Sequence, residues 1–285
     1  GKRLFNKFRR LTLMKHAFLL FVIFFAFTIN AQELALANKD GKFGYISKTG
    51  EWSIPPSFNK AKSFSGDYAI AFKGKKVGFI DRNGSWVIEP TYDKAKDFDS
   101  GLAVVMKSKR WFYVNINGEE VLTDIVTDKI YDFNHGIAFV KREGLIGLID
   151  VSGNEIIAPK YIKIMKFVNG YAKVNENGKW GLIDTKGQYF VKPTYDGISN
   201  VYGGNITAKK GEINGLIISG EFKAIDGAQK IWDFSRNNDI TYVKKNDKVG
   251  FINSNGDWIV EPIYDKVKSF KNGLAPVCKE KIWGY

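Results

Sequence analysis

Residues 77–110 read VGFIDRNGSWVIEPTYDKAKDFDSGLAVVMKSKR, and this stretch recurs with changes through most of the 285-residue chain. We take the residue before the first Gly of each copy as its anchor. The anchors are Phe43, Val77, Trp111, Ile146, Trp180, Asn214, Val249 and Trp283. Their spacing is always 34 or 35 residues, and a fixed period of about 20 to 50 residues indicates a solenoid, a propeller or another array. The chain is therefore a tandem repeat.

Each unit is predicted to contain three short strands and a connection. In the copy that starts at Val77 the strands cover residues 77–81, 85–89 and 102–106. The first two strands are joined by Asp81-Arg82-Asn83-Gly84, where the Asp can bond the turn backbone and the Gly adopts a positive φ. Matching glycines are Gly50, Gly118, Gly153, Gly187 and Gly256. We interpret the unit as a small antiparallel sheet.

The first strand of the unit is apolar on both faces, as Val77, Gly78, Phe79 and Ile80 illustrate. Such a strand needs cover on both sides, and the neighbouring units can supply it. The Gly lets another backbone or ring approach closely. Ordering the 34 residues of a unit costs on the order of 50 kcal/mol, more than a lone three-stranded sheet recovers by burial. The units must therefore stack on one another.

A Pro ends the second strand, because it has no N–H to donate to a ladder. An aromatic residue and then a Phe in the connection follow, and we expect these rings to fill the space between units. The prolines are Pro56, Pro90, Pro159, Pro193 and Pro262, and the connection residues are Phe64, Phe98, Phe133, Phe167, Phe234 and Phe270.

The pattern, seen as WGLIDTKG from Trp180 and as KVGFIDRNGSWVIEPTYD from Lys76, resembles the WG-repeat family. The resemblance covers about residues 34–285, although the full WG pair occurs only at Trp180 and Trp283. It implies a β-rich bacterial repeat protein, often exported, with no common catalytic activity.

We predict an all-β fold, a tandem array of about seven three-stranded antiparallel units of 34 residues packed like propeller blades. An open β-solenoid spiral is the alternative. The chain stops three residues into an eighth unit at Trp283, which we interpret as a truncated sequence. The repeat domain is expected to cover residues 32–285.

The amino terminus is predicted to be a targeting segment. From Met14 the chain reads MKHAFLLFVIFFAFTINAQ, with a 13-residue apolar run over residues 17–29 and Ala31 before a cleavage point. This pattern is typical of a secretory signal peptide, and the run is shorter than the roughly 20 residues that span a bilayer. We expect export to the periplasm, the cell surface or the medium, with no membrane span in the mature chain.

Charge and cysteine content narrow the function further. Without residues 1–31 the chain keeps 37 basic and 30 acidic residues, a net charge of +7. The lysines are spread through every repeat, which indicates solvated edges and turns and not a nucleic-acid interface. Cys278 is the single cysteine, so an internal disulfide and a thiolate metal site are excluded. We expect a monomer without cofactor or metal.

Catalytic residues are not indicated by any motif. His135 is the only histidine after residue 31 and lies in a predicted turn, which argues against a triad or a metal site. Asp81, Asp150 and Asp184 lack the alternating acidic ligands of a calcium loop and are interpreted as turn residues. Asp93, Asp196 and Asp265 follow a Tyr at a strand end and are interpreted as caps, with convergence at a central channel as the alternative.

Three tryptophans are candidates for ligand stacking. Trp52, Trp86 and Trp258 share one offset, two residues after the turn Gly, and aromatic rings in a row can stack on sugars or peptides. Packing between units is the structural alternative.

We hypothesise an exported, non-enzymatic protein that presents a surface to a protein or glycan partner. A propeller-type hydrolase and a structural cell-envelope component are the alternatives. The units at residues 111–145 and 214–248 depart most from the repeat: Phe112 replaces Gly, and Asp124 and Asp226 replace Pro. A local function is expected there.

Overall fold

The computed structural model describes residues 33–285 except Asn238. In this part of the chain, 29 β-strands form eight antiparallel sheets. The prediction of an all-β tandem array is confirmed. None of the described segments is a helix long and apolar enough to cross a bilayer. The predicted signal peptide, residues 1–31, lies outside the described residues.

The sheets follow one another in chain order. The first four are β1–β3 (Ala35–Lys39, Lys42–Ile46, Trp52–Phe58), β4–β7 (Lys60–Ala61, Ala69–Lys73, Lys76–Ile80, Trp86–Tyr92), β8–β11 (Lys94–Ala95, Leu102–Lys107, Arg110–Asn115, Glu120–Val121) and β12–β14 (Ile137–Arg142, Leu145–Asp150, Glu155–Tyr161). The last four are β15–β18 (Lys163–Ile164, Tyr171–Glu176, Lys179–Asp184, Tyr189–Tyr195), β19–β22 (Gly197–Ile198, Ile206–Lys210, Ile213–Ile218, Glu221–Ala224), β23–β26 (Lys230–Ile231, Ile240–Lys245, Lys248–Asn253, Trp258–Tyr264) and β27–β29 (Lys266–Val267, Val277–Lys279, Ile282–Gly284).

Most sheets gain a strand that the sequence did not predict. The chain leaves β7 at Tyr92 and forms the two-residue strand β8, in which Lys94 pairs with Met106 and Ala95 with Val105 of the next sheet. Five sheets thereby have four strands. The short strand joins a sheet to its successor by backbone hydrogen bonds at every seam except that between the third and fourth sheets.

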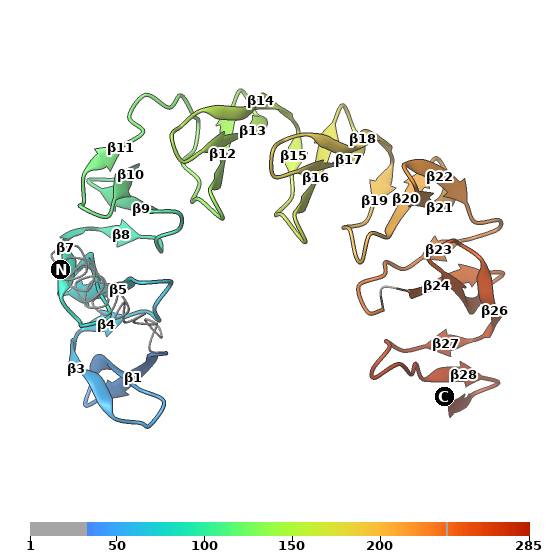
Figure 1. Ribbon diagram of the computed structural model, residues 1–285, viewed down its shortest axis with the longest axis horizontal. Coiled ribbons are helices and arrows are strands. Elements are labelled where there is room, and N and C mark those ends of the chain that lie inside the picture. Colours follow the sequence, from blue (N-terminus) through green and yellow to red (C-terminus); the bar gives the residue numbers. More distant parts are fainter. Residues whose placement is uncertain (1–32, 238) are drawn as a thin grey trace, which may run out of the picture.

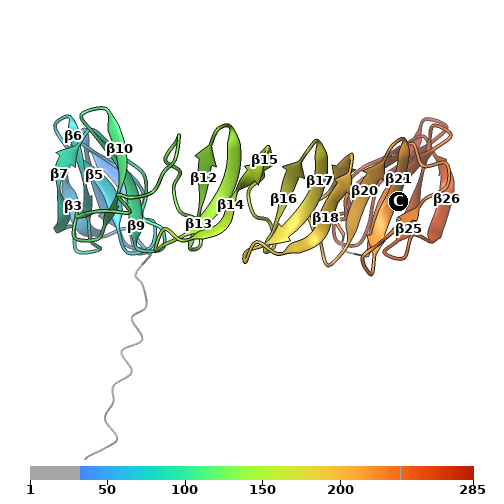
Figure 2. The same ribbon diagram turned by 90° about the horizontal axis from the view of Figure 1, so that it is seen from above.

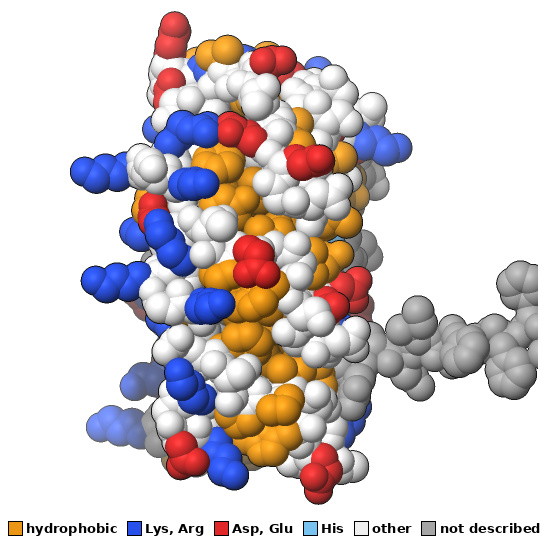
Figure 3. All heavy atoms as spheres, turned by 90° about the vertical axis from the view of Figure 1, so that its left-hand side faces the viewer, with side chains coloured by type: hydrophobic (Ala, Val, Ile, Leu, Met, Phe, Trp, Pro, Cys, Tyr) orange, Lys and Arg blue, Asp and Glu red, His pale blue; other side chains and the backbone are white. Residues whose placement is uncertain are grey.

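The eight sheets lie side by side along an open arc, with the first and last sheets at its two ends (Figure 1). The last strand of a sheet, such as β14, β22 or β26, lies on the convex side of the arc. The arc is a flat slab, and the strands run across its thickness (Figure 2). On the convex side of the first sheets a band of hydrophobic side chains runs along the middle, and Lys and Arg side chains gather along one edge (Figure 3).

The hydrophobic core is divided among the seams between neighbouring sheets. The cluster between the first two sheets contains Tyr45 and Ile54 from one sheet and Ala69 and Ile80 from the other, all at most 3% exposed. Equivalent clusters fill the other seams. Because each sheet contributes both of its faces to such clusters, the expectation that a unit needs cover on both sides is confirmed.

The connection phenylalanines insert into these seams as predicted. The Phe98 ring lies 4.6 Å from that of Phe79, and Phe64 lies 4.7 Å from Tyr45, measured between ring centroids. The Tyr45 hydroxyl donates a hydrogen bond of 2.6 Å to the carbonyl oxygen of Lys62 in the connection. Aromatic packing and a buried hydroxyl therefore fix the connection against the preceding sheet.

Candidate functional site

In the regular sheets the outer strand bends over a single Gly of the central strand. Phe43 pairs with Phe58 and Tyr45 with Ile54, so three outer residues face Gly44 alone. A Cβ on Gly44 would stand 2.5 Å from the carbonyl oxygen of Ile54, which is far inside van der Waals contact. The same crowding occurs at Gly78, Gly147, Gly181 and Gly250. The repeat needs Gly here because the outer strand of its own sheet crosses it.

The third sheet cannot form this arrangement, because Phe112 occupies the Gly position. The outer strand is reduced to β11, which pairs Val121 with Tyr113 and Glu120 with Val114. The Phe112 ring packs edge-on against Tyr92 of the preceding sheet, 6.0 Å between centroids. No strand in the described part of the chain pairs with the outer edge of β10 over residues 110–112.

The segment after β11 leaves the sheet on the convex side of the arc (Figure 1). It begins with Leu122 at a φ of 55°, a left-handed conformation that is unusual for a bulky residue. A turn follows, in which the Ile125 amide donates to the Leu122 carbonyl oxygen at 3.4 Å. Asp124 stands where the regular units have Pro, so the chain is free to turn here.

A cavity of about 410 Å³ lies between this segment and the fourth sheet. We call it the third-sheet notch. Its lining comprises residues 122–126 together with Val140, Arg142, Ile149, Ser152, Gly153 and Glu155. Leu122 and Ile125 of the lining cover Gly153, the turn Gly of the fourth sheet, much as Ile88 covers Gly118 in the second seam.

The notch combines an apolar floor with a polar rim. Val140 and Ile149 are buried at its base, whereas Arg142 and Glu155 form an ion pair at its edge. Val126 is 69% exposed beside the opening. Hydrogen-bonding side chains above apolar surface suit the binding of a polypeptide or small-molecule segment, and the lining residues include neither His nor Cys.

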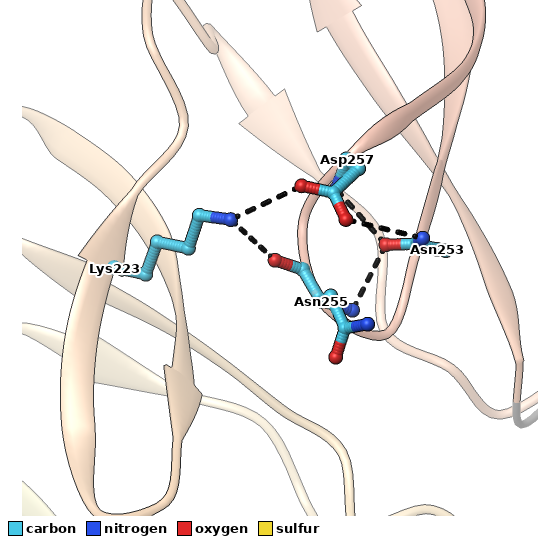
Figure 4. Close-up of polar contacts among 4 residues, drawn as sticks. All are labelled: Lys223, Asn253, Asn255 and Asp257. Carbon is cyan, nitrogen blue, oxygen red and sulfur yellow. Dashed lines mark hydrogen bonds and ion pairs between the residues drawn. The ribbon is translucent and has the colours of Figure 1, made fainter.

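The sixth sheet also departs from the repeat, but its seam is closed. It keeps Gly215, and β22 pairs with β21 without a bulge. Lys223 of β22 reaches the next sheet, where its Nζ donates to the Asn255 carbonyl oxygen at 2.6 Å and lies 3.3 Å from Asp257 Oδ1 (Figure 4). Ile225 covers Gly256 in place of the usual outer-strand side chain. A cavity of about 400 Å³ nevertheless borders this unit and is lined in part by Asn214 and residues 230–233, so cavity size does not separate the two irregular units.

Asp93, Asp196 and Asp265 each cap a hairpin of a different sheet. Asp93 accepts from Lys76 Nζ at 2.5 Å and from the Ser108 amide of the next sheet at 2.9 Å. Asp196 and Asp265 repeat this contact with Lys179 and Gly211 and with Lys248 and Glu280. The interpretation of these residues as strand-end caps is confirmed. They lie in separate sheets along the arc and do not converge on a channel.

The Lys76 hydrogen bond, followed by that of the Ser108 amide, holds the pKa of the Asp93 carboxyl below its usual range. Lys179 and Lys248 lower the pKa values of Asp196 and Asp265 in the same way. All three carboxylates stay charged at neutral pH, which suits a cap and not a general acid.

The tryptophan candidates lie at the convex ends of their sheets. Trp86 packs on the cluster of the first seam, with its ring edge-on to Phe58 at 5.6 Å between centroids. Trp258 packs on the cluster of the sixth seam. Trp52 is half-buried in the first described sheet. Their role in ligand stacking remains a prediction.

The turn residues lie as the sequence predicted. Asp81 Oδ1 accepts from the Asn83 and Ser85 amides, both at 2.9 Å, and Asp150 and Asp184 make the same turn. His135 is exposed in a turn with a φ of 50°. Over the described residues, no group of three or more His, Cys, Asp or Glu side chains could hold a metal ion.

Arg142 and Glu155 were not singled out by the sequence. Each belongs to a strand of regular pattern, and only the loss of the outer strand in the neighbouring unit exposes them. One feature of the sequence could have indicated this region. In a single unit, Phe112 replaces the Gly and Asp124 replaces the Pro of the regular pattern.

Stacked short antiparallel sheets joined end to end by short strands define a β-repeat protein. Six segments match the family model described as WG containing repeat, at residues 43–76, 78–111, 111–145, 146–180, 180–212 and 250–283. These matches cover more than half of the sequence, and the chain belongs to the WG containing repeat family. The gap between residues 212 and 250 holds β21 and β22 of the sixth sheet, which lacks the bulged outer strand, and β23 and β24 of the seventh.

No curated protein sequence matches the chain. Similar solved structures include a eukaryotic initiation factor, with 8% identity, coverage of 86% of this chain and 78% of that chain, and a TM-score of 0.44. Hsv2 of Kluyveromyces lactis has 11% identity, 76% and 86% coverage and a TM-score of 0.34. PorZ of Porphyromonas gingivalis has 9% identity, 86% and 40% coverage and a TM-score of 0.29. TM-scores this low carry no functional argument.

Proposed function

We propose that this chain is an exported, non-enzymatic repeat scaffold that binds a macromolecular partner, and that the partner is a protein. Two features of the third sheet support this proposal: the unpaired outer edge of β10 over residues 110–112 and the third-sheet notch. An open strand edge offers backbone N–H and C=O groups to an added strand, and adjacent pockets select its side chains. A glycan would not use a strand edge in this way.

The contrast with the regular sheets strengthens the argument. Their outer strands carry Pro, as at Pro90 and Pro159, and a Pro on an edge strand discourages pairing with a further chain. The third sheet lacks both the Pro and the outer half-strand. Here the chain exposes a short pairing edge, and the segment that leaves this sheet borders a cavity.

Site-specific photocrosslinking tests the proposal in the source cells. A photoreactive amino acid replaces Val126, which is 69% exposed at the notch, or Ile162, which is 55% exposed after the regular outer strand β14. We expect a discrete protein adduct from position 126 and none from position 162. Equal labelling at the two positions, or none at position 126, would contradict a partner site at the notch.

The non-enzymatic part of the proposal has its own test. The purified chain is incubated with a panel of glycans and peptides, beside variants that carry Asp93→Asn, Asp196→Asn or Asp265→Asn. We expect no turnover. Hydrolysis by the wild-type chain that any of these variants abolished would show an enzyme.

A further inference from the structure

The repeat places equivalent turns on the same face of the slab. Every sheet repeats the same antiparallel order in the same direction, so the hairpin between its two main strands always reaches one face (Figure 2). In the second sheet, for example, the pair Lys73 and Lys76 closes this hairpin. We call this the hairpin face. Its eight segments are residues 39–42, 73–76, 107–110, 142–145, 176–179, 210–213, 245–248 and 279–282.

The hairpin face holds most of the net charge of the repeat domain. Its eight segments contain 15 basic and 6 acidic residues. The caps Asp93, Asp196 and Asp265, which accept from three of these hairpins, bring the net charge of the face to +6. The domain as a whole carries 37 basic and 30 acidic residues, so the rest of it is close to neutral. On the opposite face, which we call the turn face, residues 47–51, 81–85, 115–119, 150–154, 184–188, 218–221 and 253–257 contain 3 basic and 7 acidic residues. The slab is therefore polarised across its thickness.

Many of these cations are unpaired. Six of the fifteen form ion pairs, for example Lys76 with Asp93 and Lys248 with Asp265. The other nine have no ion-pair partner among the described residues. They are Lys39, Lys42, Lys73, Lys75, Lys107, Lys109, Lys210, Lys279 and Lys281, and all are exposed. Figure 3 shows Lys and Arg side chains gathered along this edge of the first sheets.

The hairpin face also exposes aliphatic side chains. Leu145, Ile213 and Ile282 begin the second main strands of their sheets and are 37%, 54% and 76% exposed. They stand at three of the eight hairpins, whose cations are Arg142, Lys210, and Lys279 with Lys281. Basic and aliphatic side chains presented together are the combination by which peripheral proteins bind the interface of a lipid bilayer.

We infer that the hairpin face docks on an anionic lipid bilayer. The flat slab brings all eight hairpins to one plane, and a bilayer is the flat anionic surface that contacts them at the same time. Lysines near such a surface each strengthen binding by about fivefold. Aliphatic side chains at the tips gain by insertion between headgroups, whereas a linear polyanion in water would leave them exposed.

This inference goes beyond the proposed scaffold function and is tested at other residues, although Arg142 both lines the notch and belongs to a hairpin segment. The third-sheet notch opens on the convex side, at right angles to the hairpin face. A protein lying flat on a membrane would keep the notch accessible to its partner. Failure of membrane docking therefore leaves the photocrosslinking result at Val126 unaffected, and the reverse also holds.

Vesicle co-sedimentation of the full chain tests whether the positive charge of the hairpin face contributes to membrane binding. The vesicles are pure phosphatidylcholine or contain roughly one third phosphatidylglycerol, in about 0.1 M or about 0.5 M NaCl. We expect at least about tenfold tighter binding to the anionic vesicles at the lower salt concentration. Lys73→Glu with Lys107→Glu should lower this affinity by at least about tenfold.

The matched control reverses the same number of charges on the turn face, with Lys48→Glu and Lys186→Glu, and should bind like the wild type. Both variants keep residues 1–32, so any contribution of that segment cancels. Circular dichroism verifies that each variant is folded, and Lys73→Gln with Lys107→Gln provides a milder version. Equal loss in the hairpin and turn variants, or no preference for anionic vesicles, would overturn the inference.

A second pair of variants tests the aliphatic contribution. Leu145→Ser with Ile213→Ser should weaken vesicle binding several-fold, most clearly at high salt, where charge is screened. The control, Ile116→Ser with Val151→Ser, alters two turn-face side chains that are each 40% exposed and should have no effect. If the wild type bound soluble polygalacturonate and not anionic vesicles, the face would serve a linear polyanion and the lipid inference would be wrong.

Discussion

The carbonyl oxygen of Ile54 lies 2.5 Å from the point where a Cβ on Gly44 would stand. This relationship explains both the constant Gly of the repeat and its exception. In the five regular sheets the outer strand crosses the central strand over this Gly. Where Phe112 replaces it, the outer strand ends after two residues, and the chain then turns at Leu122 to border the notch.

The crossing makes a strong prediction for Gly78, which lies under the Ile88 carbonyl oxygen. Gly78→Ala should lower the free energy of unfolding by about 2 to 3 kcal/mol, because the outer strand must shift to admit the methyl group. Urea denaturation measures this change. Gly197→Ala is the matched control, since a Cβ there would meet only Lys209 Cβ at 3.8 Å and should be neutral. Equal effects would contradict the steric account.

Trp86 distinguishes seam packing from ligand stacking. Its ring contacts Phe58 of the preceding sheet, so Trp86→Ala should cost about 2 to 3 kcal/mol in urea denaturation, less than a fully buried aromatic residue. Trp86→Phe should restore most of the loss. An unchanged free energy of unfolding in Trp86→Ala, together with lost binding to a glycan array, would instead favour the stacking role.

The capping aspartates predict a stability loss in acid. The Lys76 hydrogen bond lowers the folded-state pKa of Asp93. The ionised Asp93 therefore contributes fully to the free energy of unfolding above its unfolded-state pKa, and this contribution disappears as the pH falls through the lower folded-state pKa. Replacing Asp93, Asp196 and Asp265 by Ala should lower the unfolding temperature at pH 7 and flatten its decline below about pH 4. A triple variant with the wild-type decline in acid would argue against the caps.

Tyr113 makes the corresponding prediction in alkali. Burial raises its pKa to about 12, and its hydroxyl donates to the Tyr131 carbonyl oxygen at 2.5 Å. The stabilisation is complete below the unfolded-state pKa of 10.0 and is lost as the pH rises through about 12. It amounts to at most about 2 to 3 kcal/mol.

Thermal unfolding between neutral and strongly alkaline pH measures this contribution. Tyr113→Phe should destabilise the protein by about 1 kcal/mol at pH 7 and should show a shallower loss of stability above about pH 10. Tyr285→Phe, which alters an 86% exposed phenol, should follow the wild type. Parallel alkaline profiles for Tyr113→Phe and the wild type would rule out the proposed linkage.

Much of the repeat could be predicted from local residue patterns. The turn at Asp81 and the seam insertion of Phe98 depend on contacts within one unit or with its neighbour, and they recur in enough copies to be recognised. The predicted strand end at Pro90 was wrong, because β7 bends at this point but continues to Tyr92. The short strand β8 was missed because two residues carry no periodicity. The notch was missed because its lining comes from two units, and Arg142 belongs to a unit of regular pattern.

The charge distribution of the surface also could not be predicted from single units. In the sequence the lysines are spread evenly through every repeat, and their spacing indicated only solvated turns. Folding with a strict period brings Lys73, Lys107 and their equivalents to one face, although they are 34 residues apart in the chain. Lysines that are far apart in the sequence therefore lie together on one face, because each sheet has the same orientation as the sheet before it.

The sequence by itself determined the repeat length, the antiparallel sheet, the turn chemistry and the family, because each depends on short-range spacing of Gly, Pro, Asp and aromatic residues. The tertiary structure alone decided the open arc, the notch beside Phe112 and the charged hairpin face. Those features depend on how one sheet is oriented and packed against the next, which is a relationship between units that no single unit encodes.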